Sequence, residues 1–240
     1  MTDLCTVRAA QQAAFLASRL PASPARILDA GSGRGDLALV LRDRGYDVTG
    51  IDIDPDAVEA ATSAGAPVAL ADIATYDDEP FDVVLFSLSL HHVADLDASV
   101  ARAWELLRPG GLLIADEFAW ERADDATATW FHDTAVVLHE AGLLGSHELT
   151  VVDDPLQWWV HRHRDEHPMH PGSAMADAIA RRFGDVALDR GPYLYRYISG
   201  WLPDDARGAG LFAVLEEIER RRIAGGRLTP IGLQLLTRRS

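Results

Sequence analysis

Three alternate glycines lie between a predicted strand and a predicted helix, at a spacing that suits the binding of a small cofactor. Gly31, Gly33 and Gly35 follow the apolar segment Ile27–Ala30, and a helix is predicted from about Asp36. Glycine lets the backbone turn sharply and approach a ligand closely, and the N–H groups at a helix start point toward that turn. The dinucleotide fingerprint needs its third glycine where Asp36 stands, so the pattern favours NAD less than another cofactor.

Acidic residues end the predicted strands that surround these glycines. Asp29 ends the first strand, and Asp52 ends the second about 20 residues past the glycines, the spacing of a carboxylate that binds ribose hydroxyls. Asp72 ends the third strand, and the segment Pro80–Val93 is a fourth apolar strand, containing Ser87, that runs out into the polar tip LSLHHV. Ligands bind at the carboxyl ends of parallel strands, so we expect these side chains to meet at one pocket.

Strands and helices alternate five times up to about Phe118, which predicts a parallel sheet covered on both faces. In order, the signature segments are DAGSGRG, GIDIDP, ALADI, FDVVLFSLSLHHV and LLRPGGLLIADEF, the last comprising a helix end, a Pro-Gly-Gly turn and a fifth strand. This ordered set, within residues 25–118, resembles the class I S-adenosylmethionine-dependent methyltransferases. The resemblance implies an α/β fold with a Rossmann-like doubly wound sheet, mostly parallel with an antiparallel last strand. It also implies S-adenosyl-L-methionine as cofactor and S-adenosyl-L-homocysteine as product.

The resemblance assigns cofactor contacts residue by residue. It implies that Asp29 anchors the methionine amino group through water, that Asp52 binds the ribose, and that Ser87 lines the methionine arm. Asp72 and Ile73 would contact the adenine. Two alternatives stay open, because Asp72 also suits a helix N-cap and Ser87 also suits a simple buried serine. The predicted cofactor set is Asp29, Ala30, Gly31, Gly33, Asp52, Ile53, Asp72, Ile73 and Ser87.

Methyl transfer needs a general base only if the acceptor atom carries a proton. A phenol has a pKa near 10, and a histidine with a pKa near 6.5 is a suitable proton acceptor at neutral pH. His91 is the best candidate, because it directly follows the fourth strand, although a structural role is equally open. Glu117, just after the fifth strand, is a second candidate acid or base, and Asp116 should point to the opposite side. His132 is a third candidate, on a predicted helix.

Histidines crowd one later segment without forming a metal-binding pattern. The region from Trp120 to Pro171 holds four of the six tryptophans and seven of the nine histidines. The spacing of His161, His163, His167 and His170 matches no zinc motif, and no cysteine lies nearby. Magnesium-assisted relatives place a carboxylate where this chain has Ser87. The sequence therefore predicts no metal.

The region after Phe118 is predicted to select the substrate. We expect a single domain over residues 1–240, with residues 120–171 as a mainly helical inserted lid. The predicted elements are a helix over Thr6–Leu20, the lid helix over Asp124–Leu143, a helix over Ala174–Phe183, a strand over Val186–Ile198, a helix over Asp204–Ala224 and a strand over Leu228–Leu236. In the strand over Val186–Ile198, Tyr193, Tyr195 and Tyr197 would share one face. Trp120, Trp130, Trp158 and Trp159 either form an aromatic wall for a flat substrate or pack the lid.

Composition narrows the classes of partner. The 37 acidic residues outnumber the 22 basic ones, all of them arginine, which gives a net charge of −15 and argues against a nucleic-acid partner. No apolar run approaches the roughly 20 residues that cross a bilayer, so we expect no membrane partner and a cytoplasmic location. The lone Cys5 is consistent with a reducing compartment. A monomer or a homodimer is expected.

These features predict an enzyme that methylates a small, aromatic or apolar acceptor, with O-methylation favoured over N- or C-methylation. Natural-product biosynthesis is a reasonable setting for such an enzyme. Three alternatives stay open: an S-adenosylmethionine-binding enzyme whose chemistry no longer transfers methyl, a non-catalytic cofactor-binding partner protein, and more distantly an NAD-dependent dehydrogenase.

Overall fold

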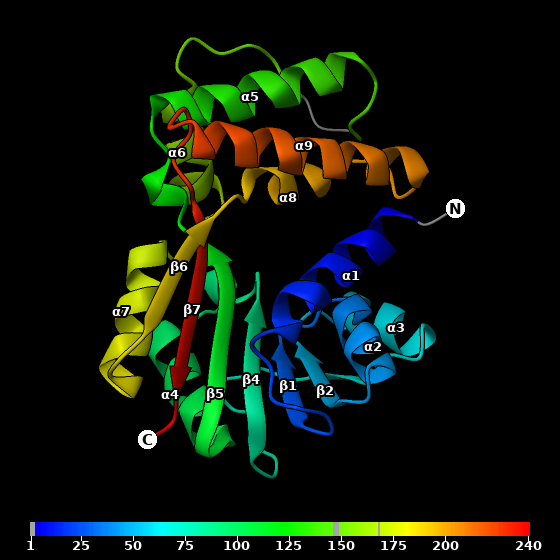
Figure 1. Ribbon diagram of the computed structural model, residues 1–240, viewed down its shortest axis with the longest axis vertical. Coiled ribbons are helices and arrows are strands. Elements are labelled where there is room, and N and C mark those ends of the chain that lie inside the picture. The colour runs from blue at the N-terminus through cyan, green and yellow to red at the C-terminus, as the bar shows by residue number, and fades with distance from the viewer. Residues whose placement is uncertain (1–2, 146–148, 168) are drawn as a thin grey trace. The chain divides into compact units, whose positions relative to one another are not determined.

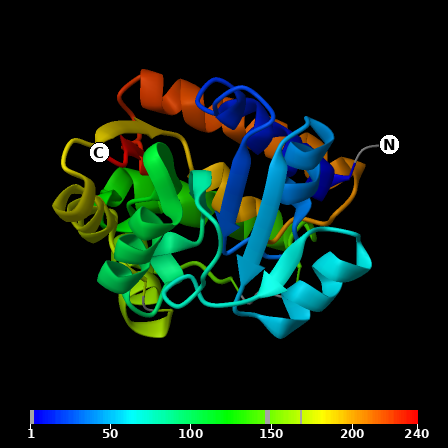
Figure 2. The same ribbon diagram turned by 90° about the horizontal axis from the view of Figure 1, so that it is seen from below.

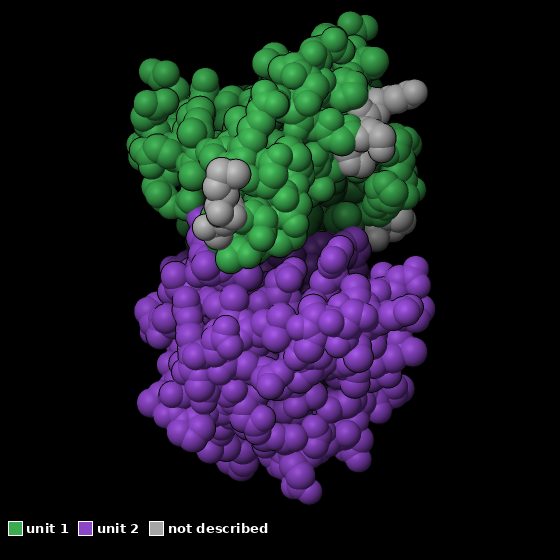
Figure 3. Space-filling model, turned by 90° about the vertical axis from the view of Figure 1, so that its right-hand side faces the viewer, with its two compact units in different colours: residues 1–7, 118–171, 190–232 green, residues 8–117, 172–189, 233–240 purple. Residues whose placement is uncertain are grey.

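The computed structural model describes residues 3–145, 149–167 and 169–240. The chain forms two compact units, shown in green and purple in Figure 3. Unit 1 comprises Met1–Val7, Phe118–Pro171 and Arg190–Gly232, and unit 2 comprises Arg8–Glu117, Gly172–Asp189 and Leu233–Ser240. Residues 146–148 and 168 of the predicted lid lie outside the described residues.

A seven-stranded sheet has the order β3-β2-β1-β4-β5-β7-β6 (Figure 1). Neighbouring strands from β3 to β5 are parallel. β7 is antiparallel to β5. The backbone hydrogen bonds show this, since Arg239 donates to Gly111 near the start of β5 and Ala119, just after the end of β5, donates to Ile231. The strands are β1 (Arg26–Ala30), β2 (Asp47–Asp52), β3 (Val68–Leu70), β4 (Phe81–Ser87), β5 (Leu107–Phe118), β6 (Ala187–Gly191) and β7 (Gly232–Arg238). This order and direction confirm the predicted fold class.

Most of the predicted helices form, with boundaries shifted by a few residues. They are α1 (Leu4–Ala17), α2 (Asp36–Asp43), α3 (Pro55–Ser63), α4 (Leu96–Leu106), α5 (Asp125–Glu140), α6 (Pro155–His161), α7 (Gly172–Phe183), α8 (Leu194–Ser199) and α9 (Ala206–Ala224), with short helical turns at Leu90–His92, Trp120–Arg122 and Arg162–Glu166. An aspartate side chain caps the start of each of α3, α4, α5, α6 and α9 by accepting a backbone N–H. Such caps satisfy N–H groups that the helix itself cannot pair. In the described part of the chain no helix is long and apolar enough to cross a membrane.

Helices cover both faces of the sheet in unit 2. On one face Ala13 and Leu16 of α1 and Leu41 of α2 pack in a buried core with side chains of β1, β4 and β5. On the other face α4 packs against β4 and α7 (Figure 2). β1, β4 and most of β5 are therefore buried on both sides, which explains why their sequences are largely apolar.

Two local predictions about strands need correction. The Pro-Gly-Gly segment is not a turn before the fifth strand, since β5 already begins at Leu107 and carries a bulge, with Gly110 at φ 77°. The strand predicted over Val186–Ile198 is wrong beyond Gly191, because Leu194–Ser199 forms α8 instead. The three tyrosines therefore do not share a strand face.

A buried carboxylate explains why this segment is a helix. Glu219 of α9, which is 1% exposed, accepts the backbone N–H groups of Tyr193, Leu194 and Tyr195 at 2.8 to 3.0 Å. Those are N–H groups that a helix start leaves unpaired. Burial raises the pKa of Glu219, and the three backbone bonds oppose this shift. A residue of α9 thus caps α8, and local periodicity gives no sign of it.

Replacing Glu219 with alanine should lower the free energy of unfolding by about 2 to 4 kcal/mol, because three buried N–H groups lose their acceptor. Chemical denaturation followed by circular dichroism measures the change. Glu217→Ala, an exposed position on the same helix, serves as the control and should shift the value by under about 1 kcal/mol. Equal effects of the two substitutions would contradict the capping role.

Candidate cofactor and catalytic site

A cavity of about 330 Å³ opens at the carboxyl ends of the first strands of unit 2. Seven of the nine predicted cofactor residues line it, and Asp29 and Ser87 do not. The lining comprises Ala30, Gly31, Gly33, Ile51, Asp52, Ile53, Ala71, Asp72, Ile73, Phe86, Leu88, Ser89, His92, Val93 and Ala94. Residues from four strand ends thus meet at one pocket, as their spacing in the sequence indicates.

The glycine turn leaves room for a ligand where a side chain would intrude. Gly31 has φ 76°, and a Cβ there would lie 2.3 Å from the Cβ of Ser89. Gly33 has φ 55°, and a Cβ there would meet nothing within 4 Å. Its N–H donates to Asp52 Oδ2 at 2.7 Å, so the turn and the ribose-type carboxylate hold each other in place. The second oxygen of Asp52 accepts the N–H of Asp54 at 2.9 Å.

Asp29 is a buried carboxylate with one unsatisfied oxygen. The residue is 1% exposed, and Ser32 Oγ donates to its Oδ2 at 2.7 Å. Its Oδ1 has no hydrogen-bond partner among the described residues. Burial raises its pKa to about 6, against the hydrogen bond from Ser32, which lowers the pKa, and the charge of Asp52 raises it further. An unpaired buried carboxylate is costly unless a donor or cation joins it, so Asp29 Oδ1 is a candidate contact for a ligand group that donates hydrogen bonds.

Apolar side chains, among them Ile53 and Ile73, line part of the cavity. Ile53 is 68% exposed although it lines the cavity, and burying such a side chain against a flat ring is favourable. Asp72 Oδ1 accepts the N–H of Ala74 at 2.9 Å, and its backbone oxygen accepts from Thr75 and Tyr76. The alternative of a helix N-cap at Asp72 is wrong, because the described residues between β3 and β4 form no helix. The side chain stabilises a local turn instead.

A left-handed residue determines which serine reaches the cavity. Leu88 has φ 58°, a conformation that non-glycine residues seldom adopt. It breaks the strand alternation after β4, so that Ser89 lines the cavity and its Oγ donates to the Ala30 carbonyl at 2.6 Å. Ser87 Oγ instead accepts from Gln12 Nε2 at 2.7 Å.

The structure brings two of the three predicted catalytic residues together. Glu117 is fully buried, and its Oε1 accepts the N–H groups of Ser89 at 2.9 Å and Leu90 at 2.7 Å. Its Oε2 lies 2.5 Å from His91 Nδ1, and His91 is 4% exposed. Glu117 thus orients the imidazole and fixes the turn that carries the cavity residue Ser89.

His132 lies in unit 1, apart in sequence and in unit from that pair. It is 1% exposed, and neither of its ring nitrogens has a hydrogen-bond partner in the described residues. Its ring meets the Trp158 ring edge-on, with centroids 5.2 Å apart. A buried imidazole without hydrogen bonds is costly unless a ligand supplies a partner. The catalytic role of His132 stays a prediction.

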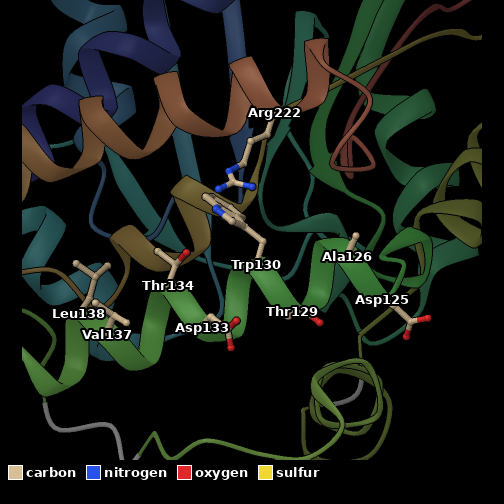
Figure 4. Close-up of a pocket in the computed structure, with 9 residues that line it drawn as sticks. All are labelled: Asp125, Ala126, Thr129, Trp130, Asp133, Thr134, Val137, Leu138 and Arg222. Carbon is tan, nitrogen blue, oxygen red and sulfur yellow. The ribbon is translucent and has the colours of Figure 1, made fainter.

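The aromatic residues of unit 1 divide between a core cluster and an outer groove. Trp159 is fully buried, packs on Phe131 and His163, and donates its indole N–H to the Trp120 carbonyl at 2.9 Å. Trp130 instead lines a groove of about 710 Å³ on α5, with Arg222 reaching toward it from α9 (Figure 4). Trp130 therefore does not join the other predicted wall residues.

The described residues contain no group of three or more His, Cys, Asp or Glu arranged to hold a metal ion. His161 instead pairs with Asp165 at 2.9 Å, and His163 Nδ1 lies 2.7 Å from the Trp159 carbonyl. Each of these two histidines therefore has a local partner.

The predicted site does not include three residues that the structure places at the carboxyl ends of the strands; among them His92 was predicted to pack or to hold the loop. Ser89 and His92 line the cavity, and Gln12 of α1 bonds to the end of β4. The SLSLHHV segment indicated a polar loop at this place, but the left-handed Leu88 is not readable from it. Nothing local to Gln12 predicts its contact, since its partners are 75 and 104 residues away.

The fold and the cavity together define a doubly wound α/β protein with a pocket at the carboxyl ends of its strands, the place where such folds bind their ligands. Residues 7–184 match the model of a family described as a methyltransferase domain. The chain belongs to this family, as the sequence predicts, and S-adenosylmethionine is the cofactor.

Known proteins resemble this chain over part or all of its length. The ubiquinone biosynthesis O-methyltransferase of Xylella fastidiosa (strain 9a5c) is 35% identical over 108 residues, which cover 41% of this chain and 44% of that protein. The tRNA 5-carboxymethoxyuridine methyltransferase of Escherichia coli (strain K12) is 32% identical over 99 residues, 37% of this chain and 38% of that one. The chain thus spans less than half the length of these curated relatives. A solved S-adenosylmethionine-dependent methyltransferase from Mesorhizobium loti shares the fold, with TM-score 0.58, 18% identity and coverage of 97% of this chain and 100% of that one.

Proposed function

We propose that this chain transfers a methyl group from S-adenosylmethionine to a hydroxyl group of a small, aromatic or apolar acceptor, without a metal. The observation that carries the proposal is the cavity, where the glycine turn, Asp52 and the exposed Ile53 meet beside the buried Asp29. The net charge of −15 favours a small acceptor over a nucleic acid. The similarity to an O-methyltransferase supports the choice of oxygen. A cytoplasmic location, a role in natural-product biosynthesis and a monomeric or homodimeric state stay predictions.

When bound, S-adenosylmethionine would supply a methyl group on a positively charged sulfur, which leaves as the sulfur of S-adenosylhomocysteine when the acceptor atom attacks the methyl carbon in line. The residues of unit 2 bind and orient the two ends of the cofactor. Asp29 offers its unsatisfied oxygen to the ammonium group, Asp52 accepts from the ribose hydroxyls, and Gly31 lets the backbone approach closely. Positioning and exclusion of water provide most of the rate enhancement in such a displacement.

His91 is the proposed general base for a protonated acceptor. Glu117 accepts hydrogen bonds only, so the 2.5 Å contact places the imidazole proton on Nδ1. That tautomer presents Nε2 as the nitrogen that accepts a proton. Glu117 is then a positioning residue, not the base itself.

Isothermal titration with S-adenosylmethionine, S-adenosylhomocysteine and NAD tests the cofactor site. We expect saturable binding of the first two, and Asp52→Ala should weaken it about ten-fold or more through lost charge-assisted hydrogen bonds to ribose. Asp56→Ala, an exposed carboxylate four residues along, is the matched control and should bind as the natural chain does. Binding of NAD alone, or of no ligand by folded protein, would refute the proposal.

The acceptor is tested by measuring S-adenosylhomocysteine release with a panel of aromatic alcohols, aromatic amines and unmodified tRNA. We expect turnover with the alcohols. Turnover with tRNA alone would overturn the small-acceptor assignment. Tight cofactor binding without methylated product from any class would favour the alternative of an S-adenosylmethionine-binding enzyme with changed chemistry.

A further inference from the structure

Gln12 ties together two polar residues at the ends of neighbouring strands. Its Nε2 donates to Ser87 Oγ at 2.7 Å and to Asp116 Oδ2 at 2.8 Å. Asp116 is 4% exposed, and Gln12 is half-buried on α1. The side-chain amide of Gln12 thus fixes the Ser87 hydroxyl and the Asp116 carboxylate relative to each other.

These residues share a sheet face with Asp29. Ser87 and Asp116 are paired in the register of β4 and β5, and Asp29 is paired with Leu85, two residues before Ser87. Side chains at positions of the same parity point to one face, so Asp29, Ser87 and Asp116 end three adjacent strands on the face that α1 covers. With strands about 4.8 Å apart and an offset of two residues along them, Asp116 lies about 12 Å from Asp29 on this face.

The cofactor cavity stops short of β5. Its lining comes from β1, β2, β4 and the segments that follow β1, β2, β3 and β4, and none comes from β5. The end of β5 is therefore the next strand end beyond the cofactor's own contacts. A carboxylate at that place accepts hydrogen bonds only, so it favours a ligand group that carries N–H or O–H and disfavours an anion.

We propose that Asp116, oriented by Gln12, binds the N–H or O–H of the acceptor atom that receives the methyl group. This inference rests on the proposed function of methyl transfer. It makes Asp116, in place of His91, the residue that contacts the hydrogen of a hydroxyl acceptor, and it also admits amines that still carry a hydrogen on the reacting atom. A carboxylate acceptor is disfavoured, because Asp29 and Asp116 place two carboxylates at this end of the face. Gln12 is a positioning residue that acts through Asp116.

Two cofactor analogues test this without knowledge of the acceptor. S-adenosylhomocysteine lacks the methyl group, and sinefungin carries a primary amine where the methyl group stands. Titration at pH 7 should show that the natural chain binds sinefungin at least about ten-fold more tightly, through a charge-assisted bond to Asp116. Asp116→Asn should remove most of this preference and Gln12→Ala part of it, and both should keep the affinity for S-adenosylhomocysteine within about two-fold.

Gln11→Ala, a neighbouring glutamine that points about 100° away on the same helix, is the matched control and should keep the full preference. Retained binding of S-adenosylhomocysteine shows that a variant is folded. A purely structural role for Gln12 would change both affinities alike and leave the ratio of sinefungin to S-adenosylhomocysteine affinity unchanged. An unchanged ratio in Asp116→Asn, or no preference in the natural chain, would overturn the inference. If Asp116→Asn does not fold, Gln12→Ala decides by the same ratio. Failure of the natural chain to bind either analogue would instead refute the proposed function.

Discussion

Replacing Glu117 with alanine should lower the free energy of unfolding by about 3 to 5 kcal/mol, because three buried hydrogen-bond donors lose their acceptor. The substitution leaves the N–H groups of Ser89 and Leu90 and the Nδ1 of His91 without the carboxylate that binds them. Ser89 lines the cofactor cavity, so release of its turn should also weaken S-adenosylmethionine binding. Denaturant unfolding and isothermal titration on the same preparation measure the two effects.

Glu59→Ala, an exposed position on α3, is the control and should change the unfolding free energy by about 0.5 kcal/mol or less. Glu117→Gln separates packing from charge, because its amide fills the same space but presents only one acceptor oxygen. Nitrogen NMR of the imidazole should show the Nδ1–H tautomer of His91 in the natural chain and a mixture in Glu117→Gln. The same tautomer in both proteins would show that Glu117 does not orient His91.

Stability should depend on pH through Asp29. Burial raises its pKa to about 6, above the ordinary value of 3.8, so the folded state holds this proton more tightly than the unfolded chain. The stabilising contribution of protonated Asp29 to the free energy of unfolding is therefore fully present below about pH 4. It is lost as the pH rises through 6, which lowers the free energy of unfolding by about 3 kcal/mol. The measurement is the difference in unfolding free energy between the natural chain and Asp29→Asn at pH 4.5, 5.5 and 7.5, in the absence of cofactor.

Ser32→Ala tests the direction of this effect. Ser32 donates to Asp29 and lowers its pKa, so its removal should move the pH window upward. Titration of S-adenosylmethionine at pH 5.5 in two buffers of different ionisation enthalpy should show proton release, because the ammonium group favours ionised Asp29. A pH-independent difference between the natural chain and Asp29→Asn would contradict the raised pKa.

Most of unit 2 was predictable because its signals are local. The glycine turn, the acids at the strand ends and the apolar strands of β1 to β5 each occupy a few consecutive residues. The strand predicted over Val186–Ile198 failed because alternating tyrosines compete with a contact made 24 to 26 residues away by Glu219. Long-range capping overrides local periodicity there.

In the candidate site, too, residues with local signals were predictable and residues placed by long-range contacts were not. Seven of nine cofactor residues line the cavity, since strand-end positions follow from strand assignment. Ser89 was missed because one left-handed residue, Leu88, changes which side chain faces the pocket. Gln12 was missed because the packing of α1 on β4 and β5 is tertiary and leaves no pattern in the surrounding sequence.

The cap at α8 also bears on how the chain is made. β6 stands at the edge of the sheet, and the residues just after it alternate in a way that suits a longer strand. Until a ribosome has released residues 219–238, a nascent chain lacks both the acceptor for the α8 N–H groups and β7, the strand that joins β6 to the sheet. Residues 187–198 can then pair with a strand of another chain. Once α9 is made, Glu219 accepts the N–H groups at the start of α8, the segment folds as a helix, and its pairing with another chain is prevented.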